Sequence, residues 1–443
     1  MAATWPDPFA WTVAAPASAE IGDHDVPLLS RHLEGCEVAL LVCGGIAAFR
    51  TPQLARALRR RGATVTAFVS EEALAYVGAQ ALEWACGRPL VRQLSWRAEH
   101  LGASEALKPS AVAGPDLPGG APGAVQPTGR CFDAYLVAPA TVNTIAKLAV
   151  GIADTLPTAV LAAALGRLAQ GRTRVLVAPT LHGSLHSPVF AANCRRLQEL
   201  GVELIPPRDA YGKHNLPDEE LLVAAVGRSL SRSPLRGRRV LVTGGPTPVP
   251  LDGVRRLTSR FSGQLGAAIQ EELLRRGAAS TLVLGDSGWR PAAWIPYRLA
   301  ATYADYQRLV LEEVQAGAEA AVLSAAVADY GPEQAVAGKI ASGAPRLDLT
   351  LRPLAKVLDA VAAAAPRMPL VSFKYLEGVS HDDLIAEARR RLDRSSLVVA
   401  NRGEEITATC QVAWLVDREG EQRVEGKAAI ASALADRLEQ LLR

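Results

Sequence analysis

The sequence is poor in methionine, aromatic residues and cysteine. Its 443 residues contain 2 methionines and 6 cysteines, and aromatic residues make up 5% of the chain. The cysteines are scattered and lack the short intervals typical of zinc ligands; they are Cys36, Cys43, Cys86, Cys131, Cys194 and Cys410. This pattern predicts no metal site and favours reduced, mostly buried thiols in a cytoplasmic protein.

The sequence also lacks long apolar runs and blocks of one charge. Lys and Arg number 48 against 45 Asp and Glu, which leaves a net charge of +3. No basic tract with interleaved aromatic residues is present, so nucleic-acid binding is not indicated. The apolar stretches are of strand length or broken by charge, so we expect no membrane helix. The acidic first 25 residues lack the basic start of a signal peptide, and we expect none.

What the chain does have is enough apolar residues for more than one core. Hydrophobic residues make up 49% of the chain, and this length predicts two or three domains. Strand and helix patterns alternate through both halves. We therefore predict an α/β protein with two Rossmann-like three-layer domains and mostly parallel sheets. The predicted parts are an N-terminal arm (1–35), a first domain (36–228) with an inserted low-complexity loop (106–131), and a second domain (236–443).

The stretch from 134 to 154 organises the first domain. An apolar run over 134–138 predicts a buried strand that stops at Pro139. The chain then turns through Thr141 and Asn143 into a helix with apolar residues up to Ile152. Such a turn places backbone N–H groups and short polar side chains at the carboxyl edge of a parallel sheet, where open α/β sheets bind ligands.

Two other predicted strands end at the same edge. Gly44, Gly45 and Ile46 come just after the strand that starts at Glu37, and Ser70 follows the strand over 64–69. Paired glycines after a strand let the backbone approach a phosphate. Together these edges predict a mononucleotide site.

The run Ala-Pro-Ala-Thr-Val-Asn-Thr-Ile-Ala-Lys-Leu-Ala from Ala138 resembles the flavin-binding segment of the homo-oligomeric flavin-containing cysteine decarboxylases, which include phosphopantothenoylcysteine decarboxylase. The resemblance implies a homo-oligomer that binds FMN. Glu99-His100-Leu101 is similar to the segment with the family's active-site histidine, which implies a catalytic role for His100. The residues implied to hold FMN are Gly44, Gly45, Ile46, Ser70, Ala140, Thr141 and Asn143.

The first half departs from this family at two places. His182 stands where the family has a substrate-binding asparagine, and the stretch from Ala210 to Pro217 lacks the family's flap cysteine. Cys194 lies in a predicted helix and does not replace that cysteine. Without it, we expect weak or no formation of the saturated product, with His182 as the alternative proton donor.

The second half resembles phosphopantothenate–cysteine ligase over about residues 236–430. The motifs that support this resemblance are Gly-Gly-Pro-Thr from Gly244, Phe-Ser-Gly-Gln-Leu-Gly from Phe261 and Ala-Ala-Val-Ala-Asp-Tyr from Ala325. The resemblance implies CTP (or ATP) with Mg²⁺, a catalytic Lys339, and Ser259 near the place of a catalytic asparagine. The residues implied to bind the nucleotide are Gly245, Thr247, Ser262, Gly263, Asp329, Phe373 and Lys374, with the last two in a turn.

Taken together, the two resemblances predict a cytoplasmic enzyme of coenzyme A biosynthesis. It would join 4′-phosphopantothenate to cysteine and decarboxylate the phosphopantothenoylcysteine formed, with small molecules as its partners. Two alternatives stay open at this point. In the first, the flavoprotein half is a non-catalytic assembly scaffold. In the second, it decarboxylates another cysteinyl substrate.

Overall fold

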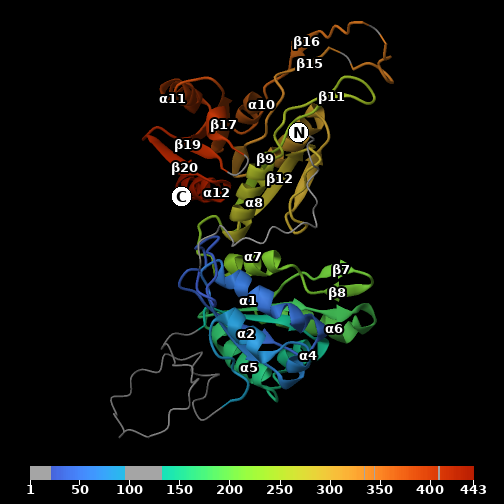
Figure 1. Ribbon diagram of the computed structural model, residues 1–443, viewed down its shortest axis with the longest axis vertical. Coiled ribbons are helices and arrows are strands. Elements are labelled where there is room, and N and C mark those ends of the chain that lie inside the picture. The colour runs from blue at the N-terminus through green and yellow to red at the C-terminus, as the bar shows by residue number, and fades with distance from the viewer. Residues whose placement is uncertain (1–20, 95–131, 334, 344, 408–409) are drawn as a thin grey trace, which may run out of the picture. The chain divides into compact units, whose positions relative to one another are not determined.

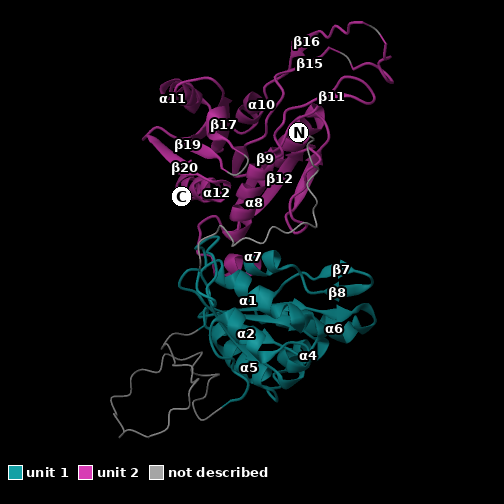
Figure 2. Ribbon diagram, viewed as in Figure 1, with its two compact units in different colours: residues 1–223 teal, residues 224–443 magenta. Residues whose placement is uncertain are grey.

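The computed structural model describes residues 21–94, 132–333, 335–343, 345–407 and 410–443. The chain divides into two compact units, residues 1–223 and 224–443, shown in separate colours in Figure 2. The division falls inside one helix, α7 (Glu219–Leu230). Two predicted features, His100 and the inserted loop 106–131, lie outside the described residues.

Unit 1 is built on a five-stranded parallel sheet with the order β2-β1-β3-β4-β6. A small antiparallel sheet, β5-β8-β7, is formed by strands that precede and follow β6 in the chain. The strands are β1 (Glu37–Val42), β2 (Thr64–Val69), β3 (Ala134–Ala140), β4 (Arg174–Pro179), β5 (Leu181–His182), β6 (Glu203–Leu204), β7 (Arg208–Ala210) and β8 (Lys213–Asn215). The helices are η1 (Ile46–Arg50), α1 (Thr51–Arg59), η2 (Glu71–Ala75), α2 (Ala79–Cys86), α4 (Val142–Val150), α5 (Leu156–Ala169), η3 (Gly183–Leu185), α6 (Pro188–Glu199) and α7.

Both faces of the central sheet in unit 1 are covered. Leu40 and Leu41 are adjacent on β1 and both fully buried, so each face of the strand is packed. Leu41 belongs to one apolar cluster with Ile145 of α4 and Leu161 of α5. Strands buried on both faces explain the near-continuous apolar runs in the sequence.

Strand β3 is longer than predicted. It continues through Pro139 to Ala140, and the helix that follows ends at Val150, before Ile152. A proline has no N–H to donate within a sheet. Pairing of β3 with β1 already ends at Val137, so no bond to β1 is lost at Pro139.

Unit 2 has an eight-stranded sheet with the order β13-β12-β9-β14-β17-β18-β19-β20. Its first six strands are parallel and β19 and β20 are antiparallel. These strands are β9 (Arg239–Gly244), β12 (Ala279–Gly285), β13 (Tyr297–Ala300), β14 (Ala320–Leu323), β17 (Leu370–Leu376), β18 (Leu397–Arg402), β19 (Val412–Val416) and β20 (Glu421–Glu425). The helices are α8 (Gln264–Arg275), α9 (Tyr303–Gln315), α10 (Val357–Ala364), α11 (His381–Arg390), η4 (Arg391–Asp393), η5 (Gly403–Glu405) and α12 (Lys427–Leu441).

Helices cover both faces of this second sheet (Figure 1). Val242 of β9 packs in one cluster with residues of α8 and α12, such as Leu273 and Leu434. Its neighbour Leu241 packs in another with residues of α9 and α10, such as Val310. Adjacent strand residues thus serve opposite faces, and the prediction of three-layer, mostly parallel domains is confirmed.

Two short hairpin-like pairs form an arm in unit 2 that the sequence patterns did not predict. They are β10 (Val249–Pro250) with β11 (Arg256–Leu257), and β15 (Tyr330–Pro332) with β16 (Leu351–Pro353). The buried carboxylate of Asp252 ties the arm together, because it accepts backbone N–H bonds from Val254, Arg255 and Ile340 at 2.7, 2.6 and 2.9 Å.

A second difference concerns Phe373 and Lys374. Both lie within strand β17 and not in a turn. The strand extends to Leu376 because β18 pairs with it along its length, up to Arg402.

Candidate functional sites

The first candidate site is the point in unit 1 where the strand order reverses, between β1 and β3. Ligands of open α/β sheets bind in the crevice at such a point. The loop after β1 approaches the loop after β3 so closely that a Cβ atom at Gly45 would lie 3.2 Å from Cγ2 of Thr141. A Cβ atom at Gly44 would lie 2.5 Å from Cβ of Glu72. Glycine at 44 therefore lets the loop after β1 pack against Glu72 at a distance that any other residue would prevent.

A residue with a hydroxyl group directly follows each of the two strands that flank β1, namely β2 and β3. Ser70 caps η2, since its Oγ accepts the Ala73 N–H at 3.3 Å. Thr141 caps α4 in the same way, with the Thr144 N–H at 3.3 Å from its Oγ1. A hydroxyl that accepts a bond still carries a proton that it can donate. These groups, the glycine backbone and the positive N-terminal end of α4 suit a phosphate.

The other predicted cradle residues differ in exposure. Ala140 is buried, Asn143 is exposed in the first turn of α4, and Ile46 is 69% exposed. Asn143 therefore presents its amide to solvent, where a bound molecule would meet it. The structure brings together the seven predicted residues along one sheet edge, with Ile46 as the exposed apolar member.

Burial makes three cysteines of unit 1 less reactive. Burial raises the pKa of the Cys43 thiol to about 11, and burial raises that of Cys86 to about 12. Burial also raises the pKa of Cys194, on α6. All three thiols are neutral near pH 7 and poor nucleophiles.

His182 lies just past the end of β4, beside the same edge. The Thr180 N–H donates to the Ala140 carbonyl at 2.9 Å, which holds this segment next to β3. The Ser184 N–H donates to Nδ1 of His182 at 3.2 Å. An Nδ1 atom that accepts a bond leaves the proton on Nε2, so His182 presents an N–H donor, as an asparagine amide would.

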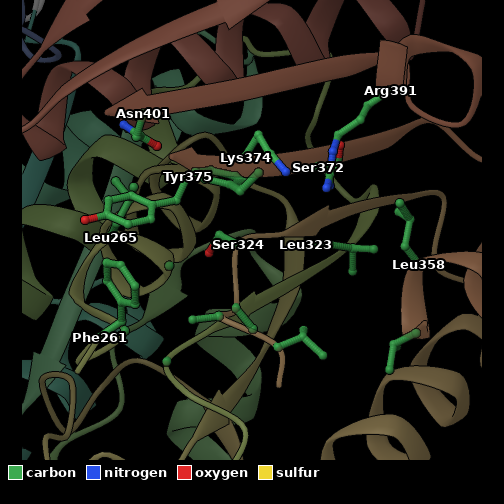
Figure 3. Close-up of a pocket in the computed structure, with 18 of the residues that line it drawn as sticks. Phe261, Leu265, Leu323, Ser324, Leu358, Ser372, Lys374, Tyr375, Arg391 and Asn401 are labelled. Atoms are coloured by element: carbon green, nitrogen blue, oxygen red, sulfur yellow. The ribbon is translucent and has the colours of Figure 1, made fainter. Parts of the chain in front are cut away.

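The second candidate site is a pocket of 1020 Å³ in unit 2 (Figure 3). The order β13-β12-β9-β14-β17-β18 reverses between β9 and β14, and the pocket opens where these two strands end. Gly245 follows β9, and Ser324 follows β14. Phe261 and Tyr375 form one wall with their rings edge to face, 5.2 Å apart.

Glycines bring the start of α8 to this pocket. Gly245 has a φ of +78°, and a Cβ atom there would lie 2.7 Å from the Gly285 carbonyl oxygen. Gly263, the N-cap of α8, has a φ of +90°, and its Cβ would lie 2.6 Å from Leu284 Cδ1. Only glycine fits such close approaches, which aim the N–H groups of α8 into the pocket.

The pocket lining is rich in cations. Its acidic members are Asp329, Asp359, Glu387 and Asp393. Its basic members are Arg260, Lys356, Lys374, Arg390, Arg391, Arg394 and Lys427. With seven cations against four carboxylates, the excess of three positive charges suits a triphosphate. Lys374 and Arg391 share Glu387, at 3.2 and 3.6 Å.

The structure brings most of the predicted nucleotide residues to this pocket. The six that line it are Gly245, Ser262, Gly263, Asp329, Phe373 and Lys374. Thr247 is buried away from it, and its Oγ1 accepts the Ala328 N–H at 2.7 Å. Ser259 is exposed beside the lining residue Arg260, and Lys339 is exposed on the arm.

Sequence patterns missed the lysine that pairs with Asp329. Lys356 Nζ donates to the Asp329 carboxylate, although 27 residues separate them. The antiparallel pairing of β15 with β16 brings the two together, since Tyr330 lies opposite Pro353. Asp329 thus lines the pocket as one half of an ion pair.

Fold and sites define a two-part protein with a flavodoxin-like strand order in one unit and a Rossmann-like order in the other. Residues 28–230 match the family "Flavoprotein", and residues 235–442 match the "DNA/pantothenate metabolism flavoprotein C-terminal domain". The coenzyme A biosynthesis bifunctional protein CoaBC of Thermococcus kodakarensis is 34% identical over 430 residues, which cover 95% of this chain and 100% of that protein.

Two further relatives each match part of the chain. A cysteine/cysteine sulfinic acid decarboxylase from an unknown prokaryotic organism is 32% identical, with 61% of this chain and 76% of that protein covered. A crystal structure of a DNA/pantothenate metabolism flavoprotein from Streptococcus pneumoniae is 27% identical, covers 46% of this chain and 99% of its own, and gives a TM-score of 0.43.

The chain therefore belongs to the family of bifunctional coenzyme A biosynthesis proteins, which combine a flavoprotein decarboxylase half with a ligase half. The predicted family and its place in coenzyme A biosynthesis are confirmed. Within the described ranges, every helix is too short or too polar to span a bilayer.

Proposed function

We propose that unit 2 joins 4′-phosphopantothenate to cysteine and that unit 1 decarboxylates the resulting 4′-phosphopantothenoylcysteine to 4′-phosphopantetheine. The observation that carries this proposal is the presence of both switch-point sites in one chain that matches the whole length of the Thermococcus protein. We further propose that the protein works in the cytoplasm and that its other partners are small molecules.

The ligase site has the charge pattern needed to activate a carboxylate with CTP or ATP and Mg²⁺. The N-terminal end of α8, from Ser262 and Gly263, would hold phosphate oxygens, while Lys374 neutralises their charge. Lys339 is a mobile point charge on the arm, suited to the pyrophosphate that leaves. Ser259 stands near the acyl-nucleotide, which cysteine then attacks. The family resemblance and the cation excess support this assignment.

The unit 1 edge fits FMN, because its phosphate would meet Gly44, Gly45 and Ser70 where side chains are absent or carry hydroxyls. When bound, the flavin supplies a reversible sink for two electrons from the carbon that bears the thiol. Thr141 and Asn143 would orient the ring. His182 offers its Nε2–H to the substrate, and His100 is our proposed base.

A second candidate function is the decarboxylation of another cysteinyl compound. It is favoured by the relative named for cysteine and cysteine sulfinic acid, and by histidine at 182 in place of the family's asparagine. A third possibility, an inert scaffold, would bind FMN without releasing CO₂.

We also propose that unit 1 assembles into a homo-oligomer. Ile46 and Phe49 are 69% and 55% exposed on η1, directly beside the cradle. Apolar side chains next to a site mark a surface that another chain or a ligand covers.

The deciding experiment mixes the purified protein with 4′-phosphopantothenate, cysteine, CTP and Mg²⁺ and follows the products by mass spectrometry. We expect about one FMN per chain and successive appearance of phosphopantothenoylcysteine and phosphopantetheine. Accumulation of the first product without CO₂ would support the scaffold. CO₂ from cysteine or its sulfinic acid alone would support the second candidate.

A further inference from the structure

A chain of three side chains, Asp209, His214 and His186, lies on the small β5-β8-β7 sheet of unit 1. The Nδ1 atom of His214 lies 2.5 Å from Oδ1 of Asp209. Its Nε2 atom lies 3.1 Å from Nδ1 of His186. We propose that this chain is a proton relay and that His186 is the catalytic acid that protonates the carbon from which CO₂ leaves. The inference rests on the proposed decarboxylase activity of unit 1.

The antiparallel pairing of the strands builds the relay. Asp209 of β7 lies directly opposite His214 of β8, so their side chains project from the same face. The two-residue turn between the strands uses Tyr211 and Gly212, both with positive φ, as tight hairpins require. His186 follows η3 and rests on the ring of the buried Phe190, with ring centres 5.3 Å apart.

Hydrogen-bond chemistry fixes one end of the relay. The carboxylate of Asp209 only accepts, so Nδ1 of His214 carries a proton. We propose that Nε2 of His214 accepts a hydrogen bond from Nδ1 of His186, which is the arrangement that a neutral His214 requires. The relay thus leaves Nε2 of His186 as the outward atom that takes up and gives the proton.

The relay is close in sequence to the sheet edge that we assign to the flavin. The segment after β4 is bound to β3 by the Thr180–Ala140 hydrogen bond, and β5, η3 and His186 follow within six residues. Figure 1 shows β7 and β8 beside α6 within unit 1. The hairpin occupies the part of the sequence where the flap cysteine was expected and was not found.

The proposed step balances without a further reactant. Decarboxylation breaks the bond between the α-carbon and the carboxylate, releases CO₂ and forms a C–H bond in its place. The overall change consumes one proton and needs no net oxidant, because a bound flavin would return to the substrate the electrons that it accepts. His186 in its imidazolium form gives that proton from Nε2 and regains one from water.

His182 is the less suitable donor. Its Nδ1 atom contacts the backbone N–H and the Oγ of Ser184, at 3.2 and 2.8 Å. His186, by contrast, is linked through His214 to the carboxylate of Asp209. This assigns His182 to binding and His186 to proton transfer. With a donor present, we propose complete turnover in place of the stalled reaction that the missing cysteine predicts.

The test supplies phosphopantothenoylcysteine to the flavin-loaded protein and follows flavin bleaching, CO₂ and phosphopantetheine separately. We expect His186→Gln to leave bleaching intact and to slow phosphopantetheine formation on the order of a hundredfold. Free imidazole should restore part of the rate to His186→Gly. Lys213→Gln, an exposed change in the same hairpin, is the control and should match the wild type.

Asp209 and His214 act through His186 and need a different readout. Asp209→Asn should lower kcat with little change in KM, and Asp209→Glu should restore it. Nitrogen NMR of the protein without flavin should show the proton of neutral His186 on Nδ1, and His214→Gln should remove that preference.

The possible outcomes distinguish a failure of the relay from a failure of the proposed decarboxylase activity. Wild-type protein that releases CO₂ while His186→Gln matches it would overturn the relay alone. Equal losses of bleaching and product without imidazole rescue would also overturn it, since they indicate a structural role. Wild-type protein that releases no CO₂ would overturn the proposed decarboxylase and, with it, the relay.

Discussion

Asn143 shows how one side chain can tune the affinity of the unit 1 edge for an anion. It is exposed in the first turn of α4, where a carboxylate is favourable for the helix but repels a bound phosphate or an electron-rich ring. We expect Asn143→Asp to weaken FMN binding about tenfold, or ~1.4 kcal/mol, without lowering the melting temperature. Fluorescence titration with FMN measures this. Gln198→Glu, the same chemical change at the exposed end of α6, should bind FMN normally.

Asp252 is the residue on which the arm of unit 2 depends. The Ile340 backbone N–H, with those of Arg255 and Val254, holds the pKa of its carboxyl at about 2. Lys339 directly precedes Ile340, so Asp252 also fixes the backbone beside our proposed catalytic lysine. The sequence suggested no role for it, because its partners are brought together only by the fold.

We expect Asp252→Asn to loosen the arm and slow ligation about tenfold, since one lost anchor of this kind costs about 1–2 kcal/mol. Faster hydrogen exchange over residues 335–343 would show the loosening. Asp348→Asn, an exposed change on the same arm, is the control. Unchanged exchange in Asp252→Asn would refute the anchoring role.

Protonation of Asp252 in acid should loosen the arm as the Asp252→Asn change does. The folded pKa of Asp252 lies below the ~3.9 of a free carboxyl, so its stabilisation is fully present above that pH. It is lost as the pH falls from about 4 through about 2. The protection of residues 335–343 from exchange, relative to the intrinsic rate at each pH, should therefore fall in this window in the wild type and stay flat in Asp252→Asn.

At the scale of elements, helices α8 and α12 are joined by a buried ion network. Glu272 is 7% exposed and pairs with Arg275 and Arg276 at 2.6 and 2.8 Å. Arg276 also reaches Asp436 and Glu439 of α12 at 2.6 and 2.8 Å. Burial opposes the charge on Glu272, but the two arginines prevail and its pKa is lowered.

We expect Glu272→Gln to destabilise unit 2 by about 3 kcal/mol, because it leaves partly buried arginines without their carboxylate. Calorimetry should show the loss as a lower melting temperature. Glu271→Gln removes a more exposed pair on the same helix and should cost less than ~1 kcal/mol. Equal effects of the two changes would show that burial of the ion pair does not determine how much stability is lost.

The long parallel strands could be predicted from sequence because each is a continuous apolar run ended by a polar or glycine turn. The strands from Glu37 and Thr64 follow this rule. The arm and the small sheet could not be predicted, since their strands have two or three residues and are held by distant partners. Asp252 with Ile340, and His186 with His214, are such pairs.

At the scale of the whole molecule, the two proposed activities reside in separate units, so one change should remove one activity only. Lys339 is exposed on a polar stretch of the arm and anchors no core. We expect Lys339→Ala to slow ligation on the order of a hundredfold, because it removes a charge that acts mainly on the leaving pyrophosphate. The melting temperatures of both units should stay unchanged, and so should decarboxylation when phosphopantothenoylcysteine is supplied directly.

Two assays on one preparation decide this. The first starts from 4′-phosphopantothenate and cysteine, and the second starts from phosphopantothenoylcysteine. Arg346→Ala removes another exposed charge from the same arm and should leave both rates near those of the wild type. Wild-type ligation in Lys339→Ala would exclude this lysine from the reaction. A parallel loss in both assays would show that the arm also governs the first unit, which a division of labour between two sheets does not predict.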